Sequence, residues 1–348
     1  MFEKFFQKFE KKAVRAISGQ RFLSIQLDIT NNCNLNCTHC YHANHSNEGS
    51  LVLNDWIEIL NEYQNLLNLL SLKPSVIISG GEPLTCNFLF DLIFEIRNRW
   101  PLVTIIVLTN GTLLDEKIVE FFKNNEVSIQ VSIEASSAIS HDRIRGNGSF
   151  YKTVNGVNLA VKEGLIVYIL TILSTRTSKE IKPLFDLAKN LKVTALNFTR
   201  LIPQEKTNIL AQSSEDRVLS GIQLRDAYKQ ILSSSNETGV MTNTDKPLYV
   251  LIDKSLGKNS LFGFQGLVVN YQGNLKVSSR SDFILGNVKK KGLKNLFLKN
   301  SIMKKLRRGK IEICGQCEYY KRCGGDRNMS YFHHGDFFKV DPGCWLVK

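Results

Sequence analysis

The stretch Cys33-Asn-Leu-Asn-Cys37-Thr-His-Cys40-Tyr41 places three thiols in one short segment, with three residues in the first gap and two in the second. A cubane iron–sulfur cluster normally takes four cysteines, one for each iron. Three cysteines with no fourth nearby leave one iron open. An open iron is a place for chemistry, whereas a fully ligated cluster mostly transfers electrons. The spacing therefore predicts a [4Fe-4S] cluster held by Cys33, Cys37 and Cys40.

A zinc site is the alternative interpretation of the same segment. His39, His42 or His45 could supply the fourth ligand that a tetrahedral zinc ion needs. Zinc sites, however, usually pair cysteines as C-x2-C and place the second pair far away in the sequence. The C-x3-C-x2-C spacing therefore favours the iron–sulfur cluster.

Composition limits the class of protein. The chain has 348 residues, of which 43% are hydrophobic, which is enough for one large domain and a smaller one. No apolar run typical of a signal peptide opens the sequence, and no stretch has the length and hydropathy of a membrane span. Seven of the eight cysteines fall into two tight groups. Without an export signal, that grouping indicates metal binding in a cytoplasmic protein.

Short β-branched runs alternate with amphipathic runs between Phe22 and about Arg200. The expected strands are Leu23–Ile29, Ser75–Ser79, Val103–Thr109, Ser128–Ile133, Ile166–Leu173 and Thr194–Thr199. The expected helices are Asn54–Leu70, Cys86–Arg99, Asp115–Asn124, Tyr151–Glu163 and Ser178–Asn190, with Asn54 and Ser178 as N-caps. Strands separated by helices predict parallel pairing through right-handed crossovers, in an open doubly wound sheet or a partial barrel. No G-x-G-x-x-G follows the first strand, which weakens a dinucleotide-binding interpretation.

Four segments are expected along the chain. They are an N-terminal amphipathic helix (1–21), an α/β domain (22–205), a polar connector with a helix around Leu219–Leu232 (206–265) and a C-terminal domain (266–348). The last begins with a predicted hairpin at Gly266–Val277, with turn residues at Gln272-Gly273-Asn274. Its end is rich in cysteine and glycine and would need a metal to hold it.

A second motif, Ser79-Gly80-Gly81-Glu82-Pro83, ends the second predicted strand. Its two glycines permit a close backbone approach, and Glu82 could accept a hydrogen bond from an amine. Alone, G-G-E-P could be an ordinary turn. Together with the cysteine triplet one strand earlier, it makes the sequence resemble the radical S-adenosylmethionine enzymes. The resemblance implies a partial (β/α)6 TIM-like barrel followed by a small C-terminal iron–sulfur domain.

The resemblance also implies a mechanism and its residues. Cys33, Cys37 and Cys40 would ligate the cluster, and S-adenosylmethionine would chelate the open iron. Gly80, Gly81 and Glu82 would hold its methionyl amine. One electron from the reduced cluster would break a carbon–sulfur bond, and the 5′-deoxyadenosyl radical would take a hydrogen atom from the substrate. The protein would position the cofactor and exclude water.

Three more candidate contacts to S-adenosylmethionine follow from the resemblance. Asn110 lies in the tripeptide that ends strand three, Ser132 stands where a serine often meets the ribose, and Arg145 could pair with the cofactor carboxylate. Each could equally be an ordinary strand-end or surface polar residue. Glu134-Ala135 departs from the Asp-Gly that the family often carries there.

The second cysteine group has the spacing Cys314-x2-Cys317-x5-Cys323-x20-Cys344. It resembles the SPASM and twitch domains of peptide-modifying radical enzymes. Arg327 stands where SPASM domains have another cysteine, and Ser278 and Ser279 lie where a ligand of a further cluster is expected. The resemblance therefore implies one auxiliary [4Fe-4S] cluster ligated by Cys314, Cys317, Cys323 and Cys344, with a zinc ribbon as the alternative.

Two features remain open. Cys86 could return a hydrogen atom to a substrate radical, or it could simply be packed. The segment Lys289–Lys310 has no acidic residue and predicts a basic amphipathic helix, which is either a solvated face or a docking site for an acidic partner.

The resemblance implies a ribosomal precursor peptide or protein as substrate and flavodoxin or ferredoxin as reductant. A small-molecule substrate is the alternative. A non-catalytic iron–sulfur or zinc protein that binds nucleic acid through its net charge of +13 is less favoured.

Overall fold

The structure is a computed structural model that describes residues 22–40, 45–203, 216–258, 263 and 266–347. The expected N-terminal amphipathic helix (1–21) lies outside these described residues. The chain divides into two compact units. Unit 1 comprises Met1–Asn32, Ser46–Ile105 and Leu261–Lys310, and unit 2 comprises Cys33–His45, Ile106–Ser260 and Ile311–Lys348.

The sheet of unit 1 is built around β1 (Phe22–Thr30). On one side β1 pairs in parallel with β2 (Lys73–Gly80), and on the other with β7 (Leu267–Val269). Antiparallel pairing then adds β8 (Asn274–Lys276) and β9 (Ile284–Asn287), so the predicted hairpin is confirmed and β9 is an extra strand. Gly273, in the hairpin turn, has φ +78°, which glycine adopts at no steric cost.

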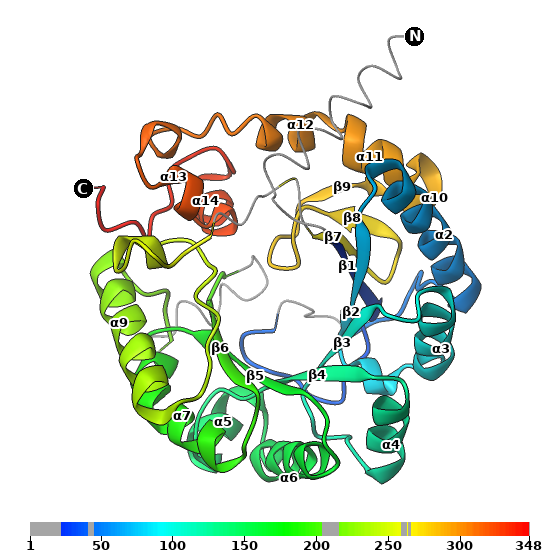
Figure 1. Cartoon of the computed structure of the whole chain (residues 1–348), viewed down its shortest axis with the longest axis horizontal. Coiled ribbons are helices and arrows are strands. Elements are labelled where there is room, and N and C mark those ends of the chain that lie inside the picture. Colours follow the sequence, from blue (N-terminus) through cyan, green and yellow to red (C-terminus); the bar gives the residue numbers. More distant parts are fainter. Residues whose placement is uncertain (1–21, 41–44, 204–215, 259–262, 264–265, 348) are drawn as a thin grey trace. The chain divides into compact units, whose positions relative to one another are not determined.

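Alternation along β1 gives the sheet one apolar face. Leu23, Ile25, Leu27 and Ile29 are all buried. The amphipathic helix α2 (Leu53–Leu70) buries Trp56, Ile59 and Leu60, and its Tyr63 hydroxyl donates to the Leu23 carbonyl oxygen. A short 3-10 turn, η1 (Pro83–Thr85), and α3 (Leu89–Arg99) follow β2 (Figure 1).

The basic segment is not the single helix that the sequence predicted. It forms three short helices, α10 (Val288–Lys291), α11 (Leu293–Lys299) and α12 (Ser301–Arg307). Gly292, with φ +72°, separates the first two, and Asn300 caps α12 with its side chain. Both residues interrupt the helical backbone because they adopt non-helical dihedrals.

Unit 2 contains the parallel strands β4 (Val127–Ser132), β5 (Val167–Leu173) and β6 (Ala195–Arg200), paired in that order. Its helices include α4 (Glu116–Asn124), α5 (Ala138–Arg145), α6 (Ser149–Lys162), α7 (Ile181–Asn190) and α9 (Gly221–Thr238). The strand β3 (Thr104–Thr109) crosses the division between the units. The C-terminal part carries η4 (Cys314–Gln316), α13 (Tyr320–Cys323) and α14 (Arg327–His334).

The six predicted strands and the alternating helices are confirmed, with differences at their ends. Asn54 does not cap α2, because the helix begins at Leu53 after an extended Val52. Ser178 lies within the 3-10 turn η2 (Thr177–Glu180), and α7 begins only at Ile181. The helix α5 is not among the expected helices; the Ser137 side chain accepts the Ser140 amide hydrogen at its start.

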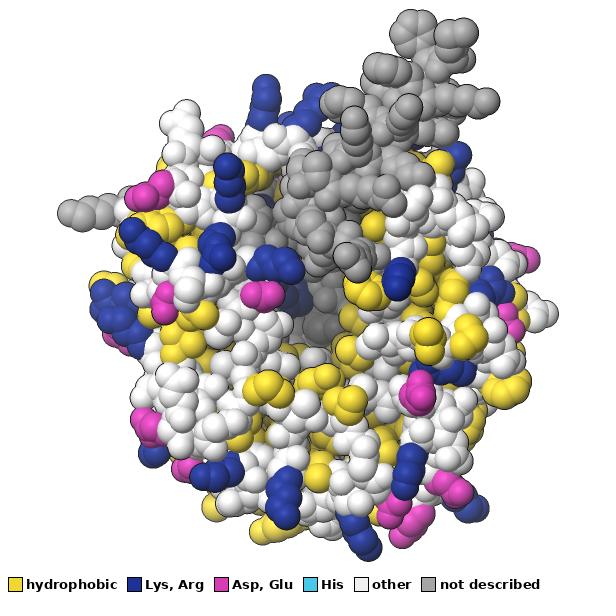
Figure 2. Space-filling model, in the orientation of Figure 1, with side chains coloured by type: hydrophobic (Ala, Val, Ile, Leu, Met, Phe, Trp, Pro, Cys, Tyr) yellow, Lys and Arg dark blue, Asp and Glu magenta, His cyan; other side chains and the backbone are white. Residues whose placement is uncertain are grey.

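The surface gives no sign of membrane spanning. Within the described part of the chain, no helix combines the length and hydropathy needed to cross a bilayer. On the face drawn in Figure 2, Lys and Arg side chains are dispersed among acidic and apolar ones.

Candidate iron–sulfur and cofactor site

The cysteine triplet lies in unit 2, on the loop that follows β1. Cys33, Cys37 and Cys40 are all partly exposed and form no disulfide. The Cys33 Sγ atom accepts the Leu35 amide hydrogen at 3.4 Å. The Cys40 amide donates to the Cys37 carbonyl oxygen at 3.1 Å, which closes a turn around the second gap of the motif. The loop thus carries the three thiols on one short segment, although in the described part of the chain they are not close enough together to hold a single metal ion.

Asn110 and α5 tie the loop to the rest of unit 2. The Asn110 side-chain amide donates to Asn34 Oδ1 at 2.8 Å and lies 4.0 Å from Cys33 Sγ. The Thr38 amide donates to the Ile144 carbonyl oxygen at 2.8 Å. Asn110 is therefore beside the cysteine loop, where the sequence predicted a cofactor contact.

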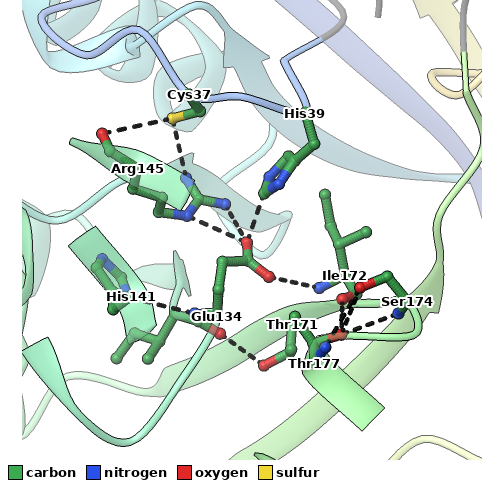
Figure 3. Close-up of polar contacts among 10 residues, drawn as sticks. Cys37, His39, Glu134, His141, Arg145, Thr171, Ile172, Ser174 and Thr177 are labelled. Carbon is green, nitrogen blue, oxygen red and sulfur yellow. Dashed lines mark hydrogen bonds and ion pairs between the residues drawn. The ribbon is translucent and has the colours of Figure 1, made fainter. Parts of the chain in front are cut away.

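A buried cluster of acidic and basic side chains contacts the cysteine loop at Cys37 and His39 (Figure 3). Glu134, with no exposed surface, accepts hydrogen bonds from Arg145 Nε at 3.1 Å and Nη2 at 2.5 Å. Its other oxygen accepts the Ile172 amide hydrogen at 2.9 Å, and His39 Nε2 lies 3.5 Å from Oε1. The remaining nitrogen, Arg145 Nη1, lies 3.9 Å from Cys37 Sγ.

The electrostatics of this cluster favour a charged pair. Burial alone would raise the pKa of Glu134, but the Arg145 guanidinium and then His39 hold it below its usual range. Burial alone would lower the pKa of Arg145, yet Glu134 raises it. Burial lowers the pKa of His39. Burial raises the pKa of the Cys37 thiol, and the Arg145 guanidinium acts against that rise.

The G-G-E-P motif lies in unit 1, against the residues that end β1. The Gly81 amide donates to the Thr30 carbonyl oxygen and the Glu82 amide to that of Asn32, each at 2.8 Å. A Cβ atom on Gly80 would lie 2.2 Å from the Thr30 oxygen, and one on Gly81 would lie 2.2 Å from the Asn32 oxygen. Both positions therefore require glycine because of the close backbone approach.

Glu82 and Cys86 flank this turn. Glu82 is 1% exposed, and its Oε1 accepts the Leu84 amide hydrogen at 3.1 Å. Cys86 is partly exposed, and burial raises the pKa of its thiol. Ser132, the last residue of β4, lies two positions before Glu134 in unit 2.

The second cysteine group surrounds one cavity in unit 2. Cys314, Cys317, Cys323 and Cys344 all line it, together with apolar side chains such as Leu248 and Leu251. Four thiols around an apolar cavity fit a fully ligated cubane cluster. Within the described ranges, however, no three Cys, His, Asp or Glu side chains are close enough to hold a single metal ion.

Hydrogen-bond donors approach two of these sulfurs. The Leu248 amide lies 3.4 Å from Cys323 Sγ, and Arg327 Nη2 lies 3.8 Å from Cys314 Sγ. Burial raises the pKa of the Cys323 thiol to about 11 and also raises that of Cys344. Thiolates at these positions would therefore depend on a bound cation for stabilisation.

The sequence interpretation missed several residues that organise both cysteine groups. Glu134 was considered only as a departure from the family's Asp-Gly, although an acid just beyond the carboxyl end of a buried parallel strand is a candidate site residue. His39 was considered only as a zinc ligand. Arg200 and Asp341, which pair beside the second group, gave no local signal because 140 residues separate them along the chain.

Comparison with known proteins agrees with this geometry. Residues 27–188 match the Radical SAM superfamily. The AdoMet-dependent heme synthase of Methanosarcina barkeri is 28% identical over 92% of this chain and 95% of its own length. Fe-coproporphyrin III synthase of the same organism is 25% identical over 92% of this chain and 87% of its own length.

Two solved structures share the fold. The anSMEcpe structure with bound AdoMet has a TM-score of 0.72 at 19% identity and covers 92% of this chain and 94% of its own. Streptococcus suis SuiB with S-adenosylmethionine has a TM-score of 0.75 at 15% identity, and the match covers 99% of this chain and 83% of the SuiB chain.

The α/β fold is therefore a radical SAM partial barrel, as the sequence predicted. Residues 27–188 therefore carry a Radical SAM domain, which confirms the resemblance that the sequence predicted.

Proposed function

We propose that this enzyme reductively cleaves S-adenosylmethionine and abstracts a hydrogen atom from a ribosomal peptide or a protein side chain. The product would carry a crosslink, an epimerised centre or a new double bond. The observation that carries the proposal is the triplet loop, whose Cys37 sulfur lies 3.9 Å from the buried Arg145 guanidinium. Flavodoxin or ferredoxin would supply electrons in the cytoplasm.

Each part of the site has a proposed role. Cys33, Cys37 and Cys40 hold the [4Fe-4S] cluster, which when bound supplies the electron for cleavage. Gly80, Gly81 and Glu82 bind the methionyl amine. Arg145 uses Nε and Nη2 on Glu134, which leaves Nη1 for the Cys37 thiolate and the cofactor carboxylate.

Asn110 and Ser132 would orient the nucleoside of S-adenosylmethionine. Asn110 is buried beside the cysteine loop, and Ser132 ends the strand that leads to Glu134. Cys86 is a candidate hydrogen donor, because its partly exposed thiol keeps its proton when burial raises its pKa.

We further propose one auxiliary [4Fe-4S] cluster held by Cys314, Cys317, Cys323 and Cys344. The shared cavity and the donors to two of the sulfurs support it. With four thiolates present, no iron stays open, so the cluster suits electron transfer or support of the fold.

Two structural neighbours support a peptide substrate. The fold is similar over 93% of this chain to anSMEcpe with AdoMet and the Cp18Cys peptide, and over 99% to SuiB with the precursor peptide SuiA. The corresponding TM-scores are 0.71 and 0.74.

The sequence relatives favour a second candidate, a small molecule. Heme synthase and Fe-coproporphyrin III synthase match this chain over nearly its whole length. A porphyrin carboxylate would suit a basic protein. The two candidates differ in what stimulates turnover, which makes them separable by experiment.

Reductive cleavage by the anaerobically reconstituted protein tests the proposal. With dithionite and S-adenosylmethionine, we expect 5′-deoxyadenosine by liquid chromatography–mass spectrometry, and we expect Cys37→Ala to abolish it. Cys86→Ala is the matched control for loss of a thiol outside the triplet. No 5′-deoxyadenosine above background from the iron-replete protein would refute radical SAM chemistry.

The substrate class is then tested by adding candidate substrates to the same reaction. Candidate precursor peptides encoded near the gene and Fe-coproporphyrin III are compared as stimulants of 5′-deoxyadenosine formation. A mass change in a peptide supports the first proposal. Turnover of the porphyrin alone would replace it with the second.

A further inference from the structure

One face of the unit 1 sheet carries a row of polar side chains. Gln26 and Asp28 alternate along β1 with the apolar residues Ile25 and Leu27, so they lie on the opposite face. Gln26 is in register with Val268 of β7, which is in register with Lys276 of β8. Because partners in register share a face, Lys276 lies on the polar face as well.

Asp28 is fully buried, but only one of its two carboxylate oxygens accepts a hydrogen bond from a described residue. Its Oδ1 accepts a hydrogen bond from Gln26 Nε2 at 2.8 Å. Its Oδ2 has no hydrogen-bond partner among the residues that the structure describes. A buried hydrogen-bond acceptor without a donor destabilises the fold. Such an acceptor therefore suggests that a bound molecule supplies the missing donor.

Lys276 is also buried, with 9% of its surface exposed, and its Nζ lies 3.5 Å from the Ser279 carbonyl oxygen. Burial lowers the pKa of Lys276, whereas the neighbouring carboxylates of Asp28 and Asp282 act to raise it. Asp28 lies in the row itself, whereas Asp282 is exposed in the segment before β9.

The row adjoins the G-G-E-P turn. Asp28 is in register with Ser79 of β2, which directly precedes Gly80, Gly81 and Glu82. Asp28 and Ser79 are both buried. A group bound at Asp28 would therefore lie next to the turn that the proposed function assigns to S-adenosylmethionine.

We propose that Asp28, with Lys276 beside it, forms a substrate subsite for a nitrogen hydrogen-bond donor: a peptide amide N–H or an ammonium group. This deepens the proposed function and rests on it. The donor satisfies Asp28 Oδ2, and the Lys276 ammonium binds the neighbouring carbonyl oxygen of the same substrate. A carboxylate-rich small molecule fits poorly, because the Asp28 carboxylate would repel it.

Ligand-observed saturation-transfer NMR on the full-length, oxidised, cluster-loaded protein tests the subsite without turnover. The probes are glycinamide, N-methylacetamide and acetate. We expect glycinamide to bind the unmodified protein, acetate not to bind, and Asp28→Asn to weaken glycinamide binding about tenfold. Lys73→Met, at an exposed position of the same unit, is the control and should bind as the unmodified protein does.

Lys276→Met provides a second variant in case Asp28→Asn fails to fold. Loss of the ammonium removes the proposed partner of the substrate carbonyl oxygen, so Lys276→Met should weaken glycinamide binding, and acetate should stay unbound. Binding of N-methylacetamide together with glycinamide would identify the ligand group as an amide, whereas glycinamide alone would identify an ammonium; both support the subsite.

Acetate binding that Lys276→Met removes would overturn the proposal, as would glycinamide binding that is equal in Asp28→Asn. The outcome is independent of catalysis. Probe binding together with an absence of 5′-deoxyadenosine would refute the proposed function and leave the subsite standing.

Discussion

Glu134 joins three separate parts of unit 2 at a single carboxylate. It contacts Arg145 at the end of α5, the Ile172 amide of β5 and His39 of the cysteine loop. Removal of such a partner would leave the buried Arg145 charge uncompensated, which typically costs about 3–5 kcal/mol. Through these contacts, the Glu134 side chain links β5 to Arg145, which lies beside the Cys37 sulfur.

His141 makes the stability of this region depend on pH. Its Nδ1 accepts the Glu134 amide hydrogen at 3.3 Å, which requires the neutral ring, and burial lowers its pKa to about 4. Between pH 6.5 and 4 the unfolded chain binds a proton that the folded chain does not, so stability falls as pH falls through this window. We expect urea unfolding, measured anaerobically, to lose about 1 kcal/mol between pH 6.5 and 5.5.

His141→Gln should flatten this dependence relative to the unmodified protein, whereas His333→Gln, at an exposed position, should preserve it. Equal slopes in the unmodified protein and His141→Gln would show that His141 does not carry the effect.

At the scale of elements, buried ion pairs of Arg200 with Asp341 and, at 3.9 Å, with Asp326 connect β6 to the C-terminal segment. Arg200, the last residue of β6, donates to Asp341 at 2.7 and 3.1 Å. Asp341 also accepts the amide hydrogens of Asp326 and Gly343, and its carbonyl oxygen accepts that of Cys344 at 3.0 Å. A Cβ on Gly343 would lie 2.2 Å from Arg200 Nη2, so a side chain at this position would displace the guanidinium. Arg200 is therefore a positioning residue for Cys344.

Arg200→Met should release this turn. Because Asp341 would remain buried without its cation, we expect about 3 kcal/mol less stability. If Cys344 ligates the auxiliary cluster, iron should fall from about eight to about four atoms per chain. Iron and sulfide analysis with thermal unfolding measures both effects. Arg225→Met, on the exposed side of α9, is the control, and unchanged iron in Arg200→Met would contradict the positioning role.

At the scale of the whole molecule, the net charge of +13 is the dominant electrostatic property. Lys290, Lys294 and Lys304 are exposed on the three short helices of unit 1. Lys289, in contrast, is already paired with Asp55. The exposed charges of Lys290, Lys294 and Lys304 would favour association with an acidic peptide.

Salt tests this idea once a peptide substrate is in hand. We expect the KM of an acidic peptide to rise roughly threefold between 50 and 300 mM KCl, because ions screen exposed charges. Replacement of Lys290, Lys294 and Lys304 by Gln should raise KM at low salt and reduce its salt dependence. A salt-independent KM would exclude docking through these helices.

The sequence by itself determined the parts of this protein that are local. Hydrophobic periodicity predicted the six strands and their helices, because an element with one buried face has apolar residues at regular intervals along its sequence. The cysteine spacing and the G-G-E-P motif indicated the radical SAM class of enzyme, because each motif is contained in a single loop of its own. The sequence predicted the start of α7 less well, because no capping side chain marks the boundary before Ile181.

Only the tertiary structure decided which distant residues meet. Helix α5 brings Arg145 to Glu134, and the C-terminal segment brings Asp341 to Arg200 of β6. Strand register brings Asp28 near Lys276. A sequence records the identity of a charged residue but not its partner. The partner depends on how strands align, and the free energy of burial enforces that alignment over the whole sheet.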